Sequence, residues 1–213
     1  MTTFEHALLG INGALAAGLH RHYGWKIVAL AGVAAVAPDW DGLPMLIDMS
    51  RFEAGHRVWG HNLLACWVLG MLLGTADYRW DLGGRIAAWI TRYGPLNELA
   101  ASIDRRRSFS ARTWGVWVGV AVAAALSQIP ADAVVSGAAG LSDWALKPFW
   151  PFSDFQFVYP LVPWGNVGVT IVFSVAMIAE LKKPAAAQRI ALVTLAVVVV
   201  YIVAWGNFVN VRS

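Results

Sequence analysis

Apolar stretches recur along the chain and are separated by short polar or proline-containing segments. Four of them, residues 62–76, 114–131, 165–181 and 190–208, have the composition of helices that cross a bilayer. Each is about 15 to 19 residues long, close to the ~20 residues that a membrane-spanning helix needs. The pattern predicts four clear spans, and the last two are expected to form a C-terminal membrane hairpin over residues 164–213.

Two shorter apolar arms precede these spans, at residues 5–22 and 27–37. Both are shorter than an ordinary span, so we expect a short N-terminal helical pair that either crosses the membrane as a tight hairpin or packs inside the bundle. At 3.6 residues per turn, His6, Gly10 and Gly13 lie near one face of the first arm. Glycines on a helix face allow a second helix to approach closely.

The connections between the apolar stretches carry most of the basic residues. Residues 77–113 contain seven arginines, and residues 182–189 read KKPAAAQR. Cytoplasmic loops of membrane proteins are enriched in Lys and Arg, so both connections are expected on the cytoplasmic side. The loops at 38–60 and 132–163 then face the extracytoplasmic side.

Composition narrows the class of protein. Hydrophobic residues make up 58% of the 213 residues and charged residues only 14%, whereas soluble domains average about 25% charged residues. We therefore expect an all-α, polytopic membrane protein that forms a single membrane-embedded domain over residues 1–213. The net charge of +3 is modest and fits topology better than a nucleic-acid partner. The single cysteine, Cys66, excludes an intrachain disulfide and is expected to be buried.

Residues 38–64, PDWDGLPMLIDMSRFEAGHRVWGHNLL, contain the densest candidate chemistry. Asp39 and Asp41 follow one apolar stretch, and His56 and His61 precede the next. Carboxylate and imidazole groups bind divalent metals, and ionisable groups at membrane depth are costly unless paired or metal-bound. Residues five apart lie about 140° apart on a helix, so both histidines reach one metal only if His56 lies in the loop and His61 opens the helix. Alternatively, the aspartates cap a helix and the histidines lie at the membrane interface.

A second unusual stretch, residues 127–163, extends this set. Gln128 and Asp132 are four residues apart and share a helix face, and Pro130 between them predicts a kink or a new helix start. The aromatic, proline-rich segment that follows is expected to be a lid or an interfacial loop over the site. The expected metal ligands, all within residues 1–160, are His6, Asp39, His56, His61 and Asp132.

Two further residues are expected to take part in catalysis. Asp41 is a candidate metal ligand, a candidate residue for orienting a ligand, or a candidate general base. Arg57 is expected to bind an anionic group, because its guanidinium matches phosphate and carboxylate oxygens; a salt bridge to a lipid headgroup or to an aspartate is the alternative.

At these residues the chain resembles the YdjM-like family of membrane-bound proteins predicted to be metal-dependent hydrolases. The shared features, in family order, are His6 in FEHALLG, the P-D-x-D element PDWD, the H-R-x-x-x-H element HRVWGH, and a helix ending in Asp132 before a Gly-rich turn and KPFWPFSD. The resemblance implies a bacterial inner-membrane, multi-pass protein with hydrolase activity. It also implies a distant similarity to zinc-dependent phospholipase C and P1 nuclease, helical enzymes whose His/Asp clusters cleave phosphoesters.

Two residues depart from the family pattern. The family usually has His four residues before the later aspartate and Ser after the second histidine of H-R-x-x-x-H; here these residues are Gln128 and Asn62. The loss of an imidazole would remove one metal from a multinuclear site or weaken catalysis.

The favoured hypothesis is a membrane-bound metal-dependent hydrolase that acts on a phosphoester, such as a lipid headgroup, at the extracytoplasmic interface. Zinc is the expected metal, ahead of manganese and iron. The alternative is a non-catalytic membrane binding or scaffold protein with a degenerate metal site, which Gln128 motivates. A small transporter or channel subunit is the third hypothesis, and the near absence of ionisable residues in the last two spans argues against it.

Overall fold

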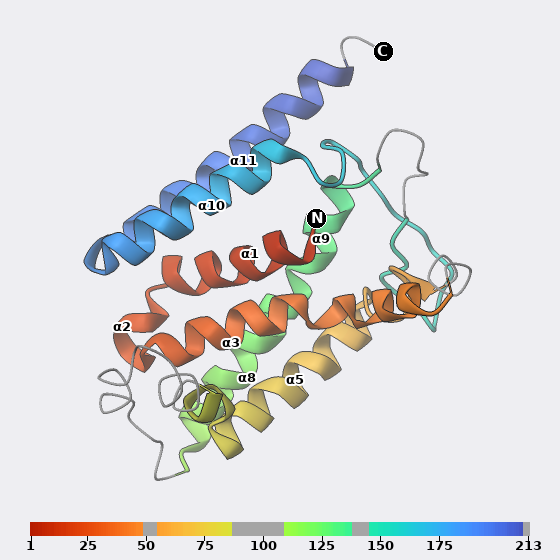
Figure 1. The fold of residues 1–213 in the computed structure, drawn as a ribbon. Coiled ribbons are helices and arrows are strands. Elements are labelled where there is room, and N and C mark those ends of the chain that lie inside the picture. Colours follow the sequence, from red (N-terminus) through yellow and green to blue (C-terminus); the bar gives the residue numbers. More distant parts are fainter. Residues whose placement is uncertain (49–54, 87–108, 138–144, 211–213) are drawn as a thin grey trace.

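The structure is a computed structural model, and it describes residues 1–48, 55–86, 109–137 and 145–210. In chain order its elements are α1 (Thr3–Ala16), α2 (Leu19–Tyr23), α3 (Trp25–Val36), η1 (Ala37–Leu46), α5 (Leu63–Trp80), α8 (Ala111–Leu126), α9 (Gln128–Val134), α10 (Val167–Lys182), η2 (Pro184–Ala186) and α11 (Ala187–Asn210). The described residues contain two isolated β-bridges and no strand. The predicted all-α architecture is therefore confirmed for this part of the chain (Figure 1).

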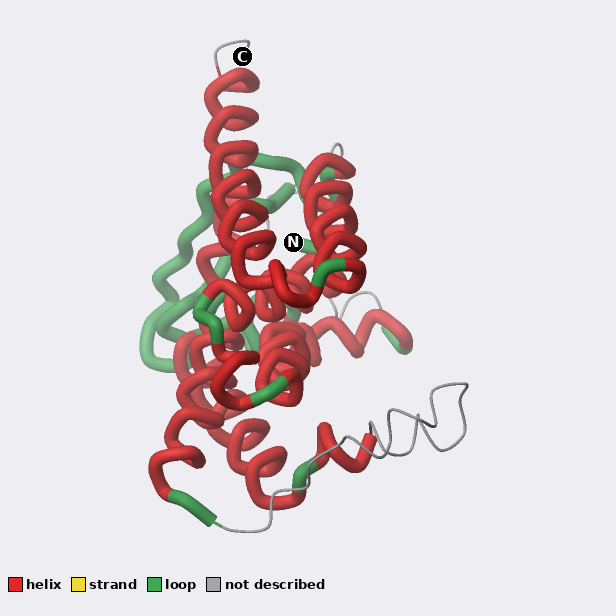
Figure 2. The backbone as a smooth tube through the Cα atoms, turned by 90° about the vertical axis from the view of Figure 1, so that its left-hand side faces the viewer, coloured by secondary structure: helices red, strands yellow, loops and turns green. Residues whose placement is uncertain are grey.

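The helices pack in pairs. α1 lies against α3, α5 lies along α8, and α10 and α11 form a hairpin whose second helix packs on α1 (Figure 1). Short loops join most of the helices, whereas a longer loop region leads into α10 (Figure 2). One buried cluster, between α1, α3 and α8, is rich in small residues such as Ala31, Ala34 and Ala121. A second cluster, which includes Leu8 and Phe173, holds α1 and α9 against the hairpin.

Three helical segments of the described residues are long and apolar enough to cross a membrane: Trp25–Pro44, Ala111–Val134 and Pro184–Phe208. The last two contain the predicted spans at 114–131 and 190–208. The first is a continuous segment in which α3 runs directly into the 3₁₀ helix η1, so the second N-terminal arm is longer than its apolar residues alone indicated.

The other two predicted spans, at residues 62–76 and 165–181, form helices but are not among these three segments. α10 has 16 residues, fewer than the ~20 of an ordinary span. α5 has 18 residues and carries Asp77 and Arg79 in its last turn. The prediction of four clear spans is therefore not confirmed.

Cys66, in α5, is buried and forms no disulfide, as expected.

The close helix approach predicted at the glycines of the first arm is present at one of the two positions. A Cβ at Gly10 would overlap the carbonyl oxygen of Ala31 and lie 2.7 Å from the Cβ of Ala35, so α1 and α3 touch here. By contrast, a Cβ built at Gly13 would have no atom of another described element within 4 Å. The inclusion of Gly13 in the contact face was wrong, because Gly13 is exposed.

The new helix start predicted at Pro130 is present. α8 ends at Leu126, and α9 begins at Gln128 with Pro130 as its third residue. Proline has no N–H to donate to the carbonyl four residues earlier, which breaks the helical ladder at this point. The break places Gln128 and Asp132 together on the buried face of α9, where both side chains are fully enclosed.

Substitutions at the two glycines of α1 should have opposite effects on stability. We expect Gly10→Ala to destabilise the fold by about 1–3 kcal/mol, because the added methyl group forces α1 away from the α3 backbone. Gly13→Ala, the matched control, should stabilise it by up to about 1 kcal/mol, because Ala is the better helix former in open space. Thermal unfolding of both variants in detergent measures the difference, and equal shifts would contradict the α1–α3 contact.

Candidate metal centre

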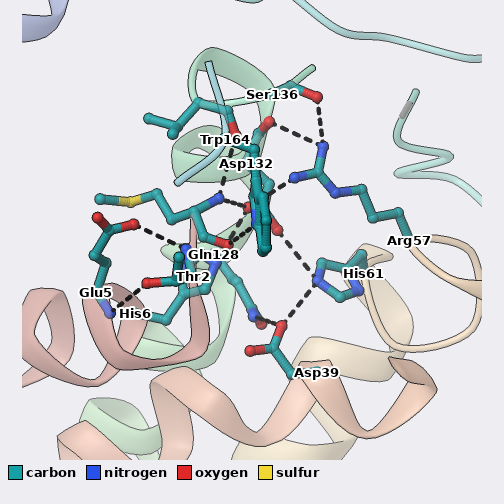
Figure 3. A network of polar contacts seen from close by, with 12 residues as sticks. Thr2, Glu5, His6, Asp39, Arg57, His61, Gln128, Asp132, Ser136 and Trp164 are labelled. Atoms are coloured by element: carbon teal, nitrogen blue, oxygen red, sulfur yellow. Dashed lines mark hydrogen bonds and ion pairs between the residues drawn. The ribbon is translucent and has the colours of Figure 1, made fainter. Parts of the chain in front are cut away.

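Four of the predicted ligands meet where α1, η1, α9 and the turn before α5 come together (Figure 3). His61 Nε2 lies 3.3 Å from Asp39 Oδ1 and 3.2 Å from Asp132 Oδ2. His6 Nε2 lies 3.1 Å from Asp132 Oδ1. His6, His61 and Asp132 are buried, while Asp39 keeps 19% of its side chain exposed. Two imidazoles and two carboxylates from four separate segments thus face one another.

His6 is positioned by the N-terminal cap of α1. Thr2 and Glu5 form a capping box, in which the Thr2 N–H donates to Glu5 Oε2 at 2.8 Å and the Glu5 N–H donates to Thr2 Oγ1 at 3.3 Å. Thr170 Oγ1 of α10 donates to the other Glu5 oxygen at 2.7 Å, so Glu5 also ties α1 to the C-terminal hairpin. Glu5 is not among the predicted site residues, although the T-x-x-E spacing at 2–5 is a recognisable capping signal.

Asp41 fixes the orientation of His61. Its Oδ2 atom lies 2.9 Å from His61 Nδ1 and accepts a hydrogen bond from the Gly60 N–H at 2.9 Å. A carboxylate at Nδ1 favours a proton there, so Nε2 is the ring atom directed at Asp39 and Asp132. Of the three roles predicted for Asp41, this geometry favours the orienting one.

The close packing of Gly60 on η1 keeps this arrangement in place. A Cβ on Gly60 would overlap the carbonyl oxygen of Pro38, so only glycine allows the turn before α5 to lie this close to η1. Asn62 then caps α5: its side chain accepts from the Ala65 N–H at 2.8 Å. Serine is also a favoured cap residue, so Asn62, which departs from the family pattern, can serve in the same local role.

His56 lies apart from the four inward-facing groups. It sits in the turn before α5, as the five-residue spacing required, and its Nδ1 atom lies 3.3 Å from Asp41 Oδ1. The rings of His56 and His61 are 5.6 Å apart and nearly perpendicular. His56 and His61 therefore contact different oxygens of Asp41, and His56 keeps 17% of its side chain exposed.

Arg57 is buried beside Asp132. Its Nη2 atom donates to Asp132 Oδ1 at 3.2 Å, and its Nη1 atom donates to Ser136 Oγ at 2.7 Å. The backbone of Arg57 is left-handed, with a φ of 61°. This is uncommon outside glycine and directs the side chain inward. Arg57 therefore holds Asp132 in place, and sequence reasoning did not identify Ser136 as its partner.

Two further groups contact the carboxylates. The Gln128 Nε2 atom lies against Asp39 Oδ1, and the amino group of Met1 lies against Asp132 Oδ1. Each carboxylate is therefore surrounded by donors from several elements, which offsets the cost of burying it.

As it stands, no group of three or more His, Cys, Asp or Glu side chains among the described residues is spaced to hold a metal ion. The contacts of 3.1–3.3 Å between His6, His61 and the carboxylates are those of direct ion pairs. A metal at about 2.0–2.2 Å from each ligand atom would lie between such groups and separate them.

One feature of the site nevertheless fits a cation. His61 Nε2 is buried and has no hydrogen-bond partner of good geometry among the described residues, despite its two carboxylate neighbours. Buried polar atoms of proteins are nearly always satisfied. Two imidazoles and two carboxylates also form a donor set that divalent transition metals accept. The residue types present are therefore ones that a divalent metal accepts, although in this arrangement they are spaced as ion pairs.

Without a metal, the three carboxylates act on His61 as a proton-binding group. Burial disfavours the imidazolium form, but Asp132, Asp39 and Asp41 outweigh it and hold the pKa of His61 well above its ordinary value of 6.5. The same carboxylates can therefore hold either a proton on His61 or a cation beside it.

An exposed aromatic surface borders this end of the molecule. Trp40 and Trp59, which flank Asp39 and Gly60 in sequence, stack with their ring centroids 6.4 Å apart and remain substantially exposed. The described part of the predicted lid, residues 145–163, runs past the start of α5, where the Leu63 N–H donates to the Pro148 carbonyl at 2.9 Å.

The comparisons with known proteins agree with a membrane assignment. A family model described as YdjM inner membrane protein matches residues 1–209. No curated protein and no solved structure matches the chain.

The metal-free protein should lose stability as its charged His61 titrates. Because the folded pKa of His61 is raised, the stabilisation is complete below about pH 6.5 and is lost as pH rises through the folded value. In excess chelator, the difference in unfolding temperature between wild type and His61→Gln should narrow as the pH is raised from 6 to 9. A difference in unfolding temperature that does not change with pH would contradict the stabilisation of charged His61 by its three carboxylate neighbours. His20→Gln serves as the control.

Proposed function

The chain belongs to the YdjM inner membrane protein family, and on that basis we propose that it is a membrane-bound metal-dependent hydrolase. The observation that carries the proposal is the buried Nε2 atom of His61, which lies 3.3 Å from Asp39 Oδ1 and 3.2 Å from Asp132 Oδ2. The same atom is oriented from behind by Asp41. A histidine held by a carboxylate on one side and open to acidic ligands on the other is the usual arrangement of a metal-binding imidazole.

Four residues would hold the metal: His6 and Asp132 on one side, His61 and Asp39 on the other. When bound, a divalent cation would polarise an ester and lower the pKa of a bound water towards ~7. Among the expected metals, zinc, manganese and iron all accept this donor set.

The surrounding residues position the ligands. Arg57 donates to Asp132 and so fixes the carboxylate between the two histidines, rather than presenting its guanidinium to a substrate. Asp41 keeps the proton of His61 on Nδ1. His56, the partly exposed histidine that also contacts Asp41, is placed to exchange a proton with solvent near the site.

The proposed substrate is a phosphoester at the membrane interface. Trp and other aromatic residues concentrate at the headgroup level of membranes. Here exposed aromatic side chains lie on η1, on the turn before α5 and on the loop that passes it: Trp40, Trp59, Phe149, Phe152 and Phe155. A site bordered by such residues would open at the depth of lipid headgroups.

The extracytoplasmic orientation of the site belongs to the same proposal. It depends on the basic residues at 182–189 and on the arginines of 77–113, of which residues 87–108 lie outside the described part.

A non-catalytic binding or scaffold role is the second candidate. The observation that favours it is Gln128, whose amide contacts Asp39 where the family usually has an imidazole. A member that binds metal but turns over no phosphoester would fit this role.

Ligand substitutions should remove metal without removing the protein from the membrane. We expect purified wild type to carry a divalent metal and His61→Ala or Asp132→Ala to carry none, as measured by elemental mass spectrometry of detergent-purified protein. The matched control is His20→Ala, which alters a histidine of α2 outside the cluster.

Wild type should hydrolyse a phosphoester presented in mixed micelles, and His61→Ala should not. Full metal content or turnover in His61→Ala would refute the assignment, whereas metal without turnover in wild type would favour the scaffold role.

Asp41→Asn should weaken metal binding without abolishing it. The amide cannot replace the carboxylate that orients His61 and raises its basicity, so metal affinity should fall by about 10–100-fold. Competition with a coloured chelator measures this change. An affinity equal to that of wild type would show that Asp41 does not act through His61, and a complete loss would make Asp41 a direct ligand.

A further inference from the structure

The C-terminal hairpin contains an apolar groove away from the candidate metal centre. The groove runs between residues 171–179 of α10 and residues 189–197 of α11, and its volume is about 500 Å³. This volume lies within the range of small-molecule sites in proteins. In Figure 1 the turn that joins the two helices lies at the end of the hairpin that points away from α9. The groove is therefore separate from the cluster of histidines and aspartates.

The lining of the groove suits a hydrocarbon chain. Its side chains are mostly Val, Ile and Ala, and the Thr194 hydroxyl donates to the Ile190 carbonyl at 2.8 Å, so α11 already satisfies that group. Residues 171–179 extend about 12 Å along the axis of α10. A polar ligand placed here would lose its hydrogen bonds to water without replacement. A long, narrow and apolar ligand would lose none.

One end of the groove is positively charged. Arg189 is the one charged residue among the described residues that line it, and it has no ion-pair partner in the described part of the chain. Lys182 and Lys183, at the end of α10, are exposed like Arg189. Glu180 is the sole acidic residue in the sequence of the two helices; its side chain is buried and is not part of the lining. The exposed charge at this end is therefore positive.

The turn between α1 and α2 adds a further positive charge beside the hairpin. Gln188 Nε2 donates to the Ala16 carbonyl at 3.1 Å, and a Cβ built at Gly18 would lie 2.9 Å from the same nitrogen. These contacts hold the start of α2 against the hairpin turn, as Figure 1 shows. Arg21 on α2 is exposed. Basic side chains from two parts of the chain thus lie at the charged end of the groove.

We propose that this groove binds an acyl chain of an anionic phospholipid, with the lipid phosphate at Arg189 and the neighbouring basic residues. A guanidinium matches the oxygens of a phosphate, and each Lys or Arg near an anionic headgroup raises lipid affinity by about fivefold. The apolar walls supply the contact with the chain. This site is independent of the proposed hydrolase centre, so neither proposal depends on the other.

A second copy of the chain fits the groove less well than a lipid. Copies inserted in one membrane share the same orientation, so a second hairpin would bring its own Lys182, Lys183 and Arg189 to the same depth. Like charges at one depth repel each other, whereas a lipid phosphate is attracted to this end. The charge of the groove therefore favours the anionic lipid as its occupant.

The headgroup part of the proposal is tested by competition between two lipids. Purified full-length protein is mixed with equal amounts of phosphatidylglycerol and phosphatidylcholine that carry identical acyl chains, and native mass spectrometry counts the lipids that stay bound. Wild type should retain one phosphatidylglycerol in preference to phosphatidylcholine. Arg189→Gln should lower this preference by about fivefold. Arg112→Gln, which alters an exposed arginine of α8 outside the groove, should leave it unchanged.

The acyl-chain part is tested by filling the groove. Val193 lines it and is 62% exposed, whereas Val200 of the same helix is 67% exposed and is not part of the lining. Val193→Trp should abolish retention of both lipids, and Val200→Trp should not. Val175→Trp, on the facing wall, replaces Val193→Trp if thermal unfolding shows that the latter does not fold.

Three results would overturn the proposal. The first is equal retention of the two lipids by wild type, and the second is an unchanged preference in Arg189→Gln. The third is equal loss in Val193→Trp and Val200→Trp, which would mean that lipid coats the hairpin without a defined site. A dimer that retains no lipid and that Val193→Trp dissociates would also overturn it, because the groove would then be a contact between copies.

Discussion

The burial of Asp132 is the constraint on which the site end of the bundle depends. A carboxylate enclosed by helices is costly unless positive or hydrogen-donating groups surround it. Asp132 receives these from the amino group of Met1, from His6 on α1, and from His61 and Arg57 in the turn before α5. These contacts join the start of the chain, its middle and α9 at one point. Removing this carboxylate would therefore take away a negative charge that Arg57 and both histidines contact inside the protein.

Much of this arrangement could be predicted from the sequence, because it follows from local chemistry. Pro130 predicted the break between α8 and α9, and the chemistry of Asp39, His61 and Asp132 predicted that they belong together. What the sequence did not reveal depends on packing between distant segments. The contact of Glu5 with Thr170 joins residues 165 positions apart, and the difference between Gly10 and Gly13 depends on where α3 passes α1. Four clear spans were not confirmed, because two of the predicted apolar stretches form helices that are short or carry charged residues in their last turn.

The two departures from the family pattern have different structural consequences. Asn62 caps α5, a role that the family serine can also fill, so this change preserves the local fold. Gln128 is buried on α9, and its amide contacts Asp39 directly. This departure therefore changes the polar group that faces the Asp39 carboxylate. One departure thus concerns the start of α5, and the other concerns the buried contacts of Asp39.

The most direct test of the account is X-ray absorption spectroscopy of the metal-loaded, detergent-purified protein. The outer-shell scattering of imidazole rings counts the histidines bound to the metal. The account predicts two imidazoles, His6 and His61, together with oxygen ligands, and one imidazole in His61→Gln. A metal surrounded only by oxygen atoms, or the same imidazole count in both proteins, would contradict the convergence of these histidines on a single metal.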